Sequence, residues 1–201
     1  NVQPGVDGEF WVRITNDYGT IDSTRATLAI GDAPAITSNL SDIIALAGSE
    51  VNLQVGVTGT APLTYQWTWN GQPMDVNGSS VTLPNSQVSH SGIYQLTISN
   101  PWGTLQSTPM NLSVGHAPAI AVQPQDVETI TGQIVTFTAD ANGSQPMSFQ
   151  WYHDEEIING ANGSSYTISN SNSQANGDYW VRISNLFGTL DSRRAKLKVG
   201  G

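Results

Sequence analysis

Apolar residues occupy every second position in several short stretches of the chain, and turn-forming residues separate these stretches. Residues 51–55 and 135–139 show this alternation, and aromatic residues keep the same rhythm in 65–69 and 149–151. Because successive side chains of a β-strand point to opposite faces, a period of two predicts strands with one buried face. About seven such strands in a domain of this size indicate two sheets packed face to face. No helix is expected.

The same segments return at a fixed spacing. Gly-Asp-Ala-Pro-Ala-Ile at 31–36 recurs as Gly-His-Ala-Pro-Ala-Ile at 115–120, 84 positions later. A fixed period of this length identifies an array of similar domains. The repeat predicts a terminal hairpin at 1–31, a first repeat at 33–115 and a second repeat at 116–200.

Each copy ends in a related pair of strands. Residues 10–20, 94–104 and 179–189 each contain a strand with alternating apolar positions, an Asn-x-aromatic-Gly turn and the start of a second strand. Glycine supplies the backbone conformation that such turns require. The aromatic residues of the three turns are Tyr18, Trp102 and Phe187.

The terminal hairpin holds only the last two strands of a copy. An isolated two-stranded hairpin is marginally stable in water. We therefore expect Phe10, Val12 and Ile14 to complete a sandwich with strands from a preceding chain or a cleaved upstream segment. A fragment boundary at this point is the alternative.

Composition narrows the classes of function. Only 11% of the residues are charged, the net charge is −9, and no Lys or Arg occurs between Arg25 and Arg182. A protein that binds phosphates needs cations to replace the released counterions, so nucleic acid and anionic membranes are poor partner candidates. The chain has no cysteine, which excludes disulfides and thiolate metal sites. No stretch is long and apolar enough for a membrane span.

Two pairs of segments resemble landmarks of a known fold. Residues 62–67 and 146–151 resemble the strand that carries the core tryptophan of the immunoglobulin fold, and 91–96 and 176–181 resemble its tyrosine-corner strand. The closest resemblance is to the cysteine-free, I-set-like tandem repeats of large bacterial secreted and surface proteins. It implies an all-β fold of tandem Greek-key sandwiches, each with two antiparallel sheets and no disulfide. It also implies an extracellular or cell-surface location.

The resemblance assigns residues to the core. Where the family carries its paired cysteines, this chain has Leu96 opposite Val55 and Val181 opposite Ala139. A disulfide typically contributes about 2–4 kcal/mol, and each fully buried aliphatic side chain about 1.5–3 kcal/mol. Packing is therefore expected to offset the missing bond. The expected core anchors are Trp67, Trp151, Tyr94, Tyr179, Val55, Leu96, Ala139 and Val181.

The sequence offers no catalytic or metal site. The three histidines, His90, His116 and His153, lie in different parts of the pattern, without zinc spacing or a Ser-His-Asp order, and each is expected at the surface. The acidic run at 154–156 lacks the alternation of oxygen ligands in calcium loops. We therefore expect no cofactor, no metal and no enzymatic activity.

Aromatic residues outside the expected core have two interpretations. Trp102 lies in a turn, and Trp180 lies on the strand face opposite Tyr179. Exposed rings can stack on sugars or pack into interfaces, or they can pack against the junction between domains. The candidate interaction residues are Tyr18, Trp102, Phe187, Phe10, Val12 and Ile14.

Together these features predict a structural or adhesive repeat segment of an extracellular or cell-surface protein. Completion of residues 1–31 by a neighbouring chain would make it a filament-forming subunit. Expected partners are other copies, adjacent immunoglobulin-like repeats, and a surface protein or glycan, with no nucleic acid and no membrane insertion. The alternatives are a carbohydrate- or protein-binding module and an accessory region of a larger secreted enzyme.

Overall fold

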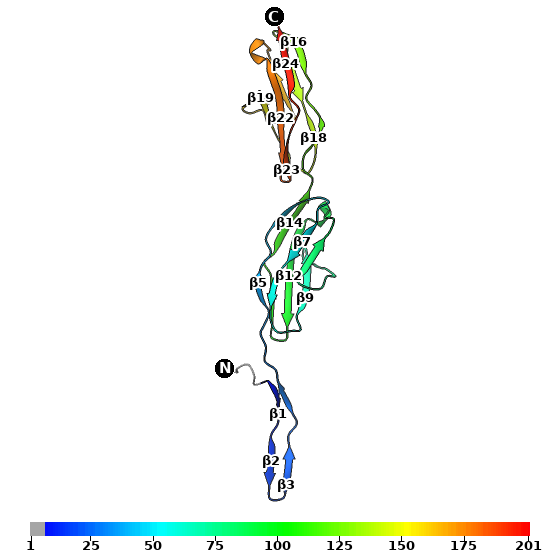
Figure 1. Ribbon diagram of the computed structural model, residues 1–201, viewed down its shortest axis with the longest axis vertical. Coiled ribbons are helices and arrows are strands. Elements are labelled where there is room, and N and C mark those ends of the chain that lie inside the picture. Colours follow the sequence, from blue (N-terminus) through cyan, green and yellow to red (C-terminus); the bar gives the residue numbers. More distant parts are fainter. Residues whose placement is uncertain (1–6) are drawn as a thin grey trace. The chain divides into compact units, whose positions relative to one another are not determined.

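The computed structural model describes residues 7–201, whose regular elements are almost all β-strands (Figure 1). Within this range the helical segments are two 3-10 turns, η1 (Val88–His90) and η2 (Ser173–Ala175). The first six residues of the expected hairpin at 1–31 lie outside the described residues. The chain divides into two compact units. One contains residues up to 41 with 52–82 and 93–111, and the other contains 42–51, 83–92 and 112–201.

The second unit contains the whole second repeat. Its larger sheet has the order β16 (Val127–Ile130), β24 (Ala195–Gly200), β22 (Gly177–Asn185), β19 (Ser148–His153) and β20 (Glu156–Ile157), with β23 (Gly188–Asp191) paired to β22. The other layer pairs β15 (Ala119–Val122) with β18 (Asp140–Asn142) and β17 (Val135–Thr138) with β21 (Ser165–Ile168). The pairs of the second repeat are antiparallel except β16 and β24, which run parallel. This parallel edge departs from the expected purely antiparallel sheets.

The core of the second repeat lies between these layers. Val135 and Phe137 from β17 pack with Trp151, Val181 and Ile183 from the larger sheet. The Phe137 and Trp151 rings lie 6.3 Å apart between centroids. Because the inward residues are every second one along each strand, alternation places them in a single buried layer.

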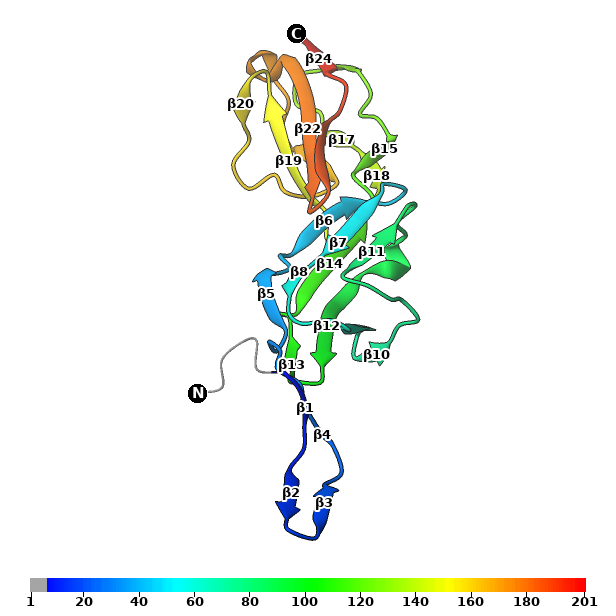
Figure 2. The same ribbon diagram turned by 60° about the horizontal axis from the view of Figure 1, so that its bottom comes forward.

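The first unit contains the terminal hairpin and most strands of the first repeat. The hairpin pairs β1 (Gly8–Phe10) with β4 (Ala26–Leu28) and β2 (Arg13–Asn16) with β3 (Gly19–Asp22), as seen in Figure 2. The first repeat pairs β5 (Ala35–Ser38) with β8 (Gly56–Thr58), β7 (Val51–Gln54) with β11 (Ser80–Leu83), and β9 (Thr64–Trp69) with both β10 (Gln72–Pro73) and β12 (Gly92–Asn100); β13 (Gly103–Gln106) pairs with β12. Strands β6 (Ile43–Leu46) and β14 (Met110–Gly115) pair in parallel.

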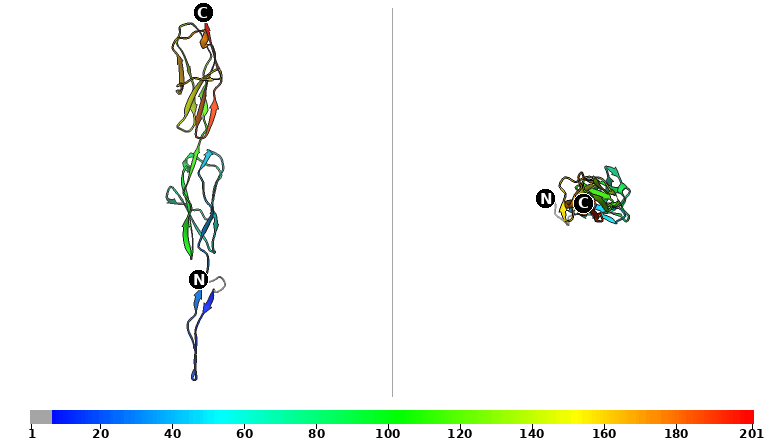
Figure 3. Two further views of the ribbon diagram at one scale, coloured as in Figure 1. Left: turned by 90° about the vertical axis from the view of Figure 1, so that its left-hand side faces the viewer. Right: turned by 90° about the horizontal axis from the view of Figure 1, so that it is seen from above.

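The terminal hairpin has the register of the last strands of the second repeat. Phe10 lies opposite Ala26 as Tyr179 lies opposite Ala195. The β2–β3 pairing likewise matches the β22–β23 pairing, including an Arg opposite an Asp in each. The left view of Figure 3 shows the hairpin, in blue, from a further direction. The hairpin therefore has the strand pairing that the last strands adopt in a complete repeat.

Candidate functional site

Each repeat contains one fully buried tryptophan held by a backbone acceptor. The indole nitrogen of Trp67 donates to the Gly78 carbonyl at 3.0 Å, and that of Trp151 donates to the Gly163 carbonyl at 2.9 Å. A buried indole N–H without a partner would cost free energy. These hydrogen bonds allow the whole ring to leave water.

The positions that correspond to the family's cysteines hold buried aliphatic side chains. Leu96 and Val55 are buried in the first repeat, and Val181 and Ala139 are buried in the second. Leu96 lies opposite Trp67, and Val181 lies opposite Trp151, in adjacent strands. The side chains that replace the sulfur atoms therefore pack beside the tryptophan.

Tyr179 is a buried anchor with a polar end. Its hydroxyl donates to the Ala175 carbonyl at 2.9 Å, and its ring stacks on Phe137 at 4.6 Å between centroids. Burial, with smaller contributions from Tyr166 and Asp154, raises the pKa of Tyr179 to about 12. Tyr94 is the equivalent residue of the first repeat, and burial also raises its pKa.

His153 differs from the expected surface histidine. Its ring stacks on Tyr179 with 4.5 Å between centroids, and its Nε2 lies 3.1 Å from the Asn176 carbonyl oxygen. The side chain is half-buried as a result. Alternation along β19 did not reveal this because the partner comes from the neighbouring strand.

The final turn of each complete repeat contacts the linker segment that precedes the first strand of the same repeat. The Asn100 amide donates to the carbonyls of Asp32 at 2.7 Å and Thr60 at 2.9 Å. The Trp102 ring covers Gly31, where a Cβ would lie 2.7 Å from the indole. We call the Asn-x-aromatic-Gly turn that makes these contacts, here Asn100, Trp102 and Gly103, a linker clasp.

The second repeat has the same linker clasp. The Asn185 amide donates to the carbonyls of His116 and Ser144, both at 2.8 Å. The Phe187 ring covers Gly115 so closely that a Cβ there would overlap it. Phe187 and Trp102 are both half-buried. These two candidate interaction residues therefore contact the linker of their own unit.

The terminal hairpin exposes the side chains whose counterparts are buried. Phe10 is 52% exposed, Val12 60% and Ile14 62%. In the second repeat the same positions hold Tyr179, Val181 and Ile183, which are buried. We call the side of the hairpin that carries Phe10, Val12 and Ile14 its apolar face.

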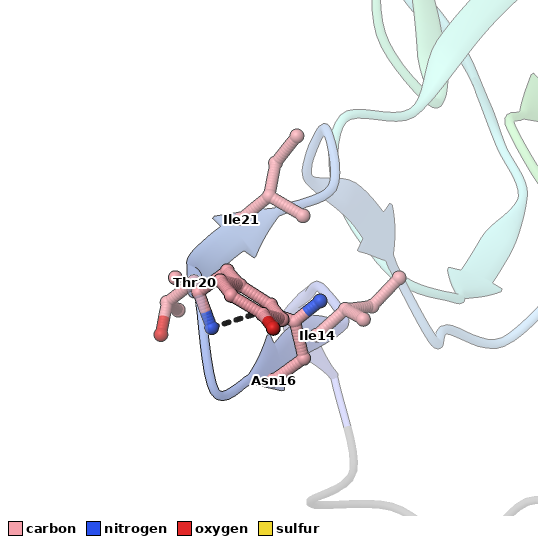
Figure 4. Close-up of a pocket in the computed structure, with 6 residues that line it drawn as sticks. Ile14, Asn16, Thr20 and Ile21 are labelled. Atoms are coloured by element: carbon pink, nitrogen blue, oxygen red, sulfur yellow. Dashed lines mark hydrogen bonds between the residues drawn. The ribbon is translucent and has the colours of Figure 1, made fainter.

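The hairpin tip also carries a shallow pocket (Figure 4). Its lining residues are Ile14, Asn16, Tyr18, Gly19, Thr20 and Ile21. Tyr18 is 98% exposed, although its counterparts Trp102 and Phe187 lie against a linker glycine. The tip therefore presents the residues of a linker clasp to solvent.

Trp180 is covered, so of the two interpretations of the outer aromatic residues its ring does not fit stacking on a sugar. It is 6% exposed and stacks on Tyr152 with 4.1 Å between centroids. The guanidinium groups of Arg182 and Arg194 lie over the ring at 5.4 and 5.2 Å from its centroid. Arg182 is held by a bidentate pair with Asp191 at 2.7 and 2.8 Å.

Residues 7–201 contain no group of three His, Cys, Asp or Glu side chains placed to hold a metal ion. In the same residues no helix has the length and apolar character to cross a membrane. The asparagine of the linker clasp was missed by sequence reasoning, which treated it only as a turn residue. Its recurrence as Asn16, Asn100 and Asn185 was the available signal.

The sequence model of the immunoglobulin domain matches residues 33–100 and 117–185. Among similar proteins, hemicentin-2 of Mus musculus is 28% identical over 149 residues, which cover 72% of this chain and 3% of that protein. The cell adhesion molecule DSCAM of Rattus norvegicus is 27% identical over 70% of this chain and 7% of its own length. Contactin-5 of Danio rerio is 23% identical over 95% of this chain and 19% of its own length. This chain thus spans less than a fifth of each relative.

Solved structures agree with the fold. The I-band fragment I67–I69 of titin superposes with a TM-score of 0.75 at 19% identity, covering 100% of this chain and 77% of that one. The relatives named above are animal proteins, so they do not support the bacterial part of the expected resemblance. The all-β fold of tandem immunoglobulin-like domains is confirmed. The chain belongs to the immunoglobulin domain family.

Proposed function

We propose that this chain is a structural and adhesive repeat segment of an extracellular or cell-surface protein, without enzymatic activity. Residues 1–31 are completed by strands of a neighbouring chain. DSCAM of Rattus norvegicus, one of the similar proteins, is a cell adhesion molecule by name, which supports an adhesive role. Partners are then other immunoglobulin-like repeats or a surface protein.

The apolar face of the hairpin carries this proposal. In the second repeat the equivalent face is covered by the opposite layer, whose Phe137 stacks on Tyr179, and is flanked by Trp151 of the adjacent strand. Burying an exposed aliphatic or aromatic side chain of this size contributes about 1.5–3 kcal/mol. Covering Phe10, Val12 and Ile14 would therefore give a substantial driving force for association.

The hairpin is already arranged for this step. The Val12 N–H donates to Ser23 Oγ at 2.9 Å, and the Ser23 N–H donates to the Val12 carbonyl at 2.8 Å. The complete second repeat has the same two bonds between Val181 and Ser192, at 3.0 and 2.9 Å. A partner that contributes strands equivalent to β15–β21 of the second repeat meets a preformed surface, so little ordering of the hairpin is needed. Completion of this kind joins this chain to the chain that supplies the strands.

The test uses the second repeat as the source of strands. A fragment of residues 115–176, which ends before β22, is titrated into the full 15N-labelled chain while amide spectra are recorded. We expect saturable shifts at Phe10, Val12 and Ile14. A fusion that joins residue 169 to residue 1 places the same strands in register and serves as the reference for a completed sandwich.

Matched variants place a single charge on either side of the hairpin. Val12→Lys puts the charge on the apolar face and is expected to abolish binding. Thr27→Lys puts it at the position where the second repeat carries Lys196, and binding should persist. Absence of these shifts in both the mixture and the fusion would refute the proposal.

The carbohydrate-binding alternative loses its main candidates. Trp180 is covered by two guanidinium groups, and Trp102 lies on Gly31. A ring that stacks on a sugar needs an open face. The aromatic residues of these positions instead support packing within each repeat.

A further inference from the structure

The two occupied linker clasps bind the same kind of segment. In both, the bound segment has the sequence Gly-x-Ala-Pro, at 31–34 and at 115–118. The aromatic ring covers the glycine, and the asparagine amide binds the carbonyl of residue x. The clasp glycines, Gly103 and Gly188, approach the alanine so closely that an added Cβ would lie 3.0 and 3.1 Å from its methyl group.

These contacts explain the sequence that is bound. A side chain on the first residue would overlap the ring, so this position requires glycine. Residue x contributes only backbone groups to these bonds: its carbonyl accepts from the asparagine amide, and its N–H donates to Thr60 Oγ1 or Ser144 Oγ. Its side chain can therefore vary, as Asp32 and His116 show. The asparagine amide has two N–H donors, and its second acceptor is the carbonyl of Thr60 or Ser144 in the same repeat.

The hairpin tip has an Asn, an aromatic residue and a Gly at the same spacing, and it shares one local hydrogen bond with the occupied clasps. The Asn16 Oδ1 accepts the Tyr18 N–H at 2.9 Å. In the occupied clasps Asn100 accepts from Trp102 at 3.0 Å, and Asn185 accepts from Phe187 at 2.9 Å. The turn itself therefore holds the backbone of the aromatic residue, before any linker is bound.

We propose that Asn16, Tyr18 and Gly19 form a third linker clasp, which binds an extended Gly-x-Ala-Pro segment of the chain that completes the hairpin. This proposal rests on the proposed function and names the partner's chemistry. The glycine lies on the Tyr18 ring, and the carbonyl of residue x accepts from the Asn16 amide. The partner is thus an immunoglobulin-like segment whose Gly-x-Ala-Pro leader precedes its first strand and which lacks a final hairpin of its own. Segments 31–34 and 115–118 already lie in clasps, so an intact second copy is not the source.

The experiment compares two fragments and three variants of the full chain. Fragment 115–176 carries the leader Gly-His-Ala-Pro, and fragment 119–176 lacks it. Asn16→Ala and Tyr18→Ala remove the clasp contacts. Asp17→Ala changes the variable residue of the same turn and is the control. Dissociation constants come from the amide titration described above.

We expect Asn16→Ala and Tyr18→Ala each to weaken binding of the fragment with the leader about tenfold, as loss of a well-placed contact should. Asp17→Ala should change it less than about twofold. Neither clasp variant should weaken binding of the leaderless fragment, because that fragment has no segment for the clasp to bind. A variant that merely distorts the turn would instead weaken binding of both fragments.

The outcomes separate the two proposals. If the fragments bind and Val12→Lys abolishes binding, but the clasp variants bind the leader as tightly as the native chain, the third clasp is overturned and completion of the hairpin stands. Equal weakening of both fragments also overturns the clasp. If neither fragment binds and the fusion leaves Phe10 exposed, both proposals fail.

Discussion

Replacing Ser192 by alanine tests how burial sets the value of a hydrogen bond. Ser192 Oγ accepts the Val181 N–H at 3.0 Å and donates to the Arg193 carbonyl at 2.8 Å. Val181 is fully buried. The terminal hairpin repeats the arrangement with Ser23, which binds Val12 and Thr24 at 2.9 Å each, but all three residues are exposed.

The two substitutions should therefore differ in cost. Ser192→Ala leaves the Val181 N–H buried without its acceptor, which costs about 1–3 kcal/mol of unfolding free energy. Ser23→Ala leaves a comparable group where water can replace the hydroxyl, so its effect should stay within about 0.5 kcal/mol. The local bonds are nearly identical, and burial is the variable that changes.

Urea unfolding followed in two-dimensional amide spectra measures this difference. Peaks from β22 and β24 report the second repeat, because tandem repeats need not unfold as one unit. With a slope of about 1–3 kcal/mol per molar urea, Ser192→Ala should lower the midpoint visibly, and Ser192→Thr, which keeps the hydroxyl, should recover much of the loss. If Ser192→Ala left the midpoint of β22 and β24 unchanged, the reasoning from burial would be wrong.

Three further predictions concern other contacts of the second repeat. The Tyr179 hydroxyl should stay protonated until the pH approaches its pKa of about 12. Because folding raises this pKa, the contribution of protonated Tyr179 to the free energy of unfolding is complete below pH 10 and is lost as pH rises through 12. Tyr179→Phe should flatten that decline in alkaline unfolding curves. Gly115→Val should destabilise the second repeat by about 1–3 kcal/mol through overlap with Phe187, and Phe187→Ala should partly rescue it in thermal unfolding; no rescue would argue against the linker clasp. Asp191→Asn should cost less than about 1 kcal/mol at pH 7, because the pair with Arg182 is about half exposed. The hydrogen bond from Arg182 lowers the pKa of Asp191, so this contribution is present above the unfolded pKa and disappears as pH falls through the folded one; a cost that persists in acid would contradict an electrostatic origin.

Much of the fold follows from local periodicity. Tyr94, Leu96 and Ile98 alternate along one strand, and all three are buried in β12. Trp67 and Trp151 were expected in the core from the resemblance, and both are fully buried. Alternation is sufficient here because the pleat of a strand converts sequence spacing into a choice of face.

Other features depend on strands that are distant in sequence. Alternation placed Trp180 on the outer face, but Arg194 and Tyr152 cover it. The parallel pairing of β16 with β24 joins segments about seventy residues apart, and no local pattern specifies it. The Asn-x-aromatic-Gly motif predicted a turn and did not reveal the linker that Asn100 and Asn185 bind.

The sequence alone determined the strands, their buried faces and the repeat, because these depend on steric preferences of neighbouring residues and on a period that recurs along one chain. Only the tertiary structure decided which surfaces remain open. Val12 and Val181 have the same local pattern, yet one is exposed and the other is buried. Burial is a property of what packs against a strand, and that partner comes from elsewhere in the fold.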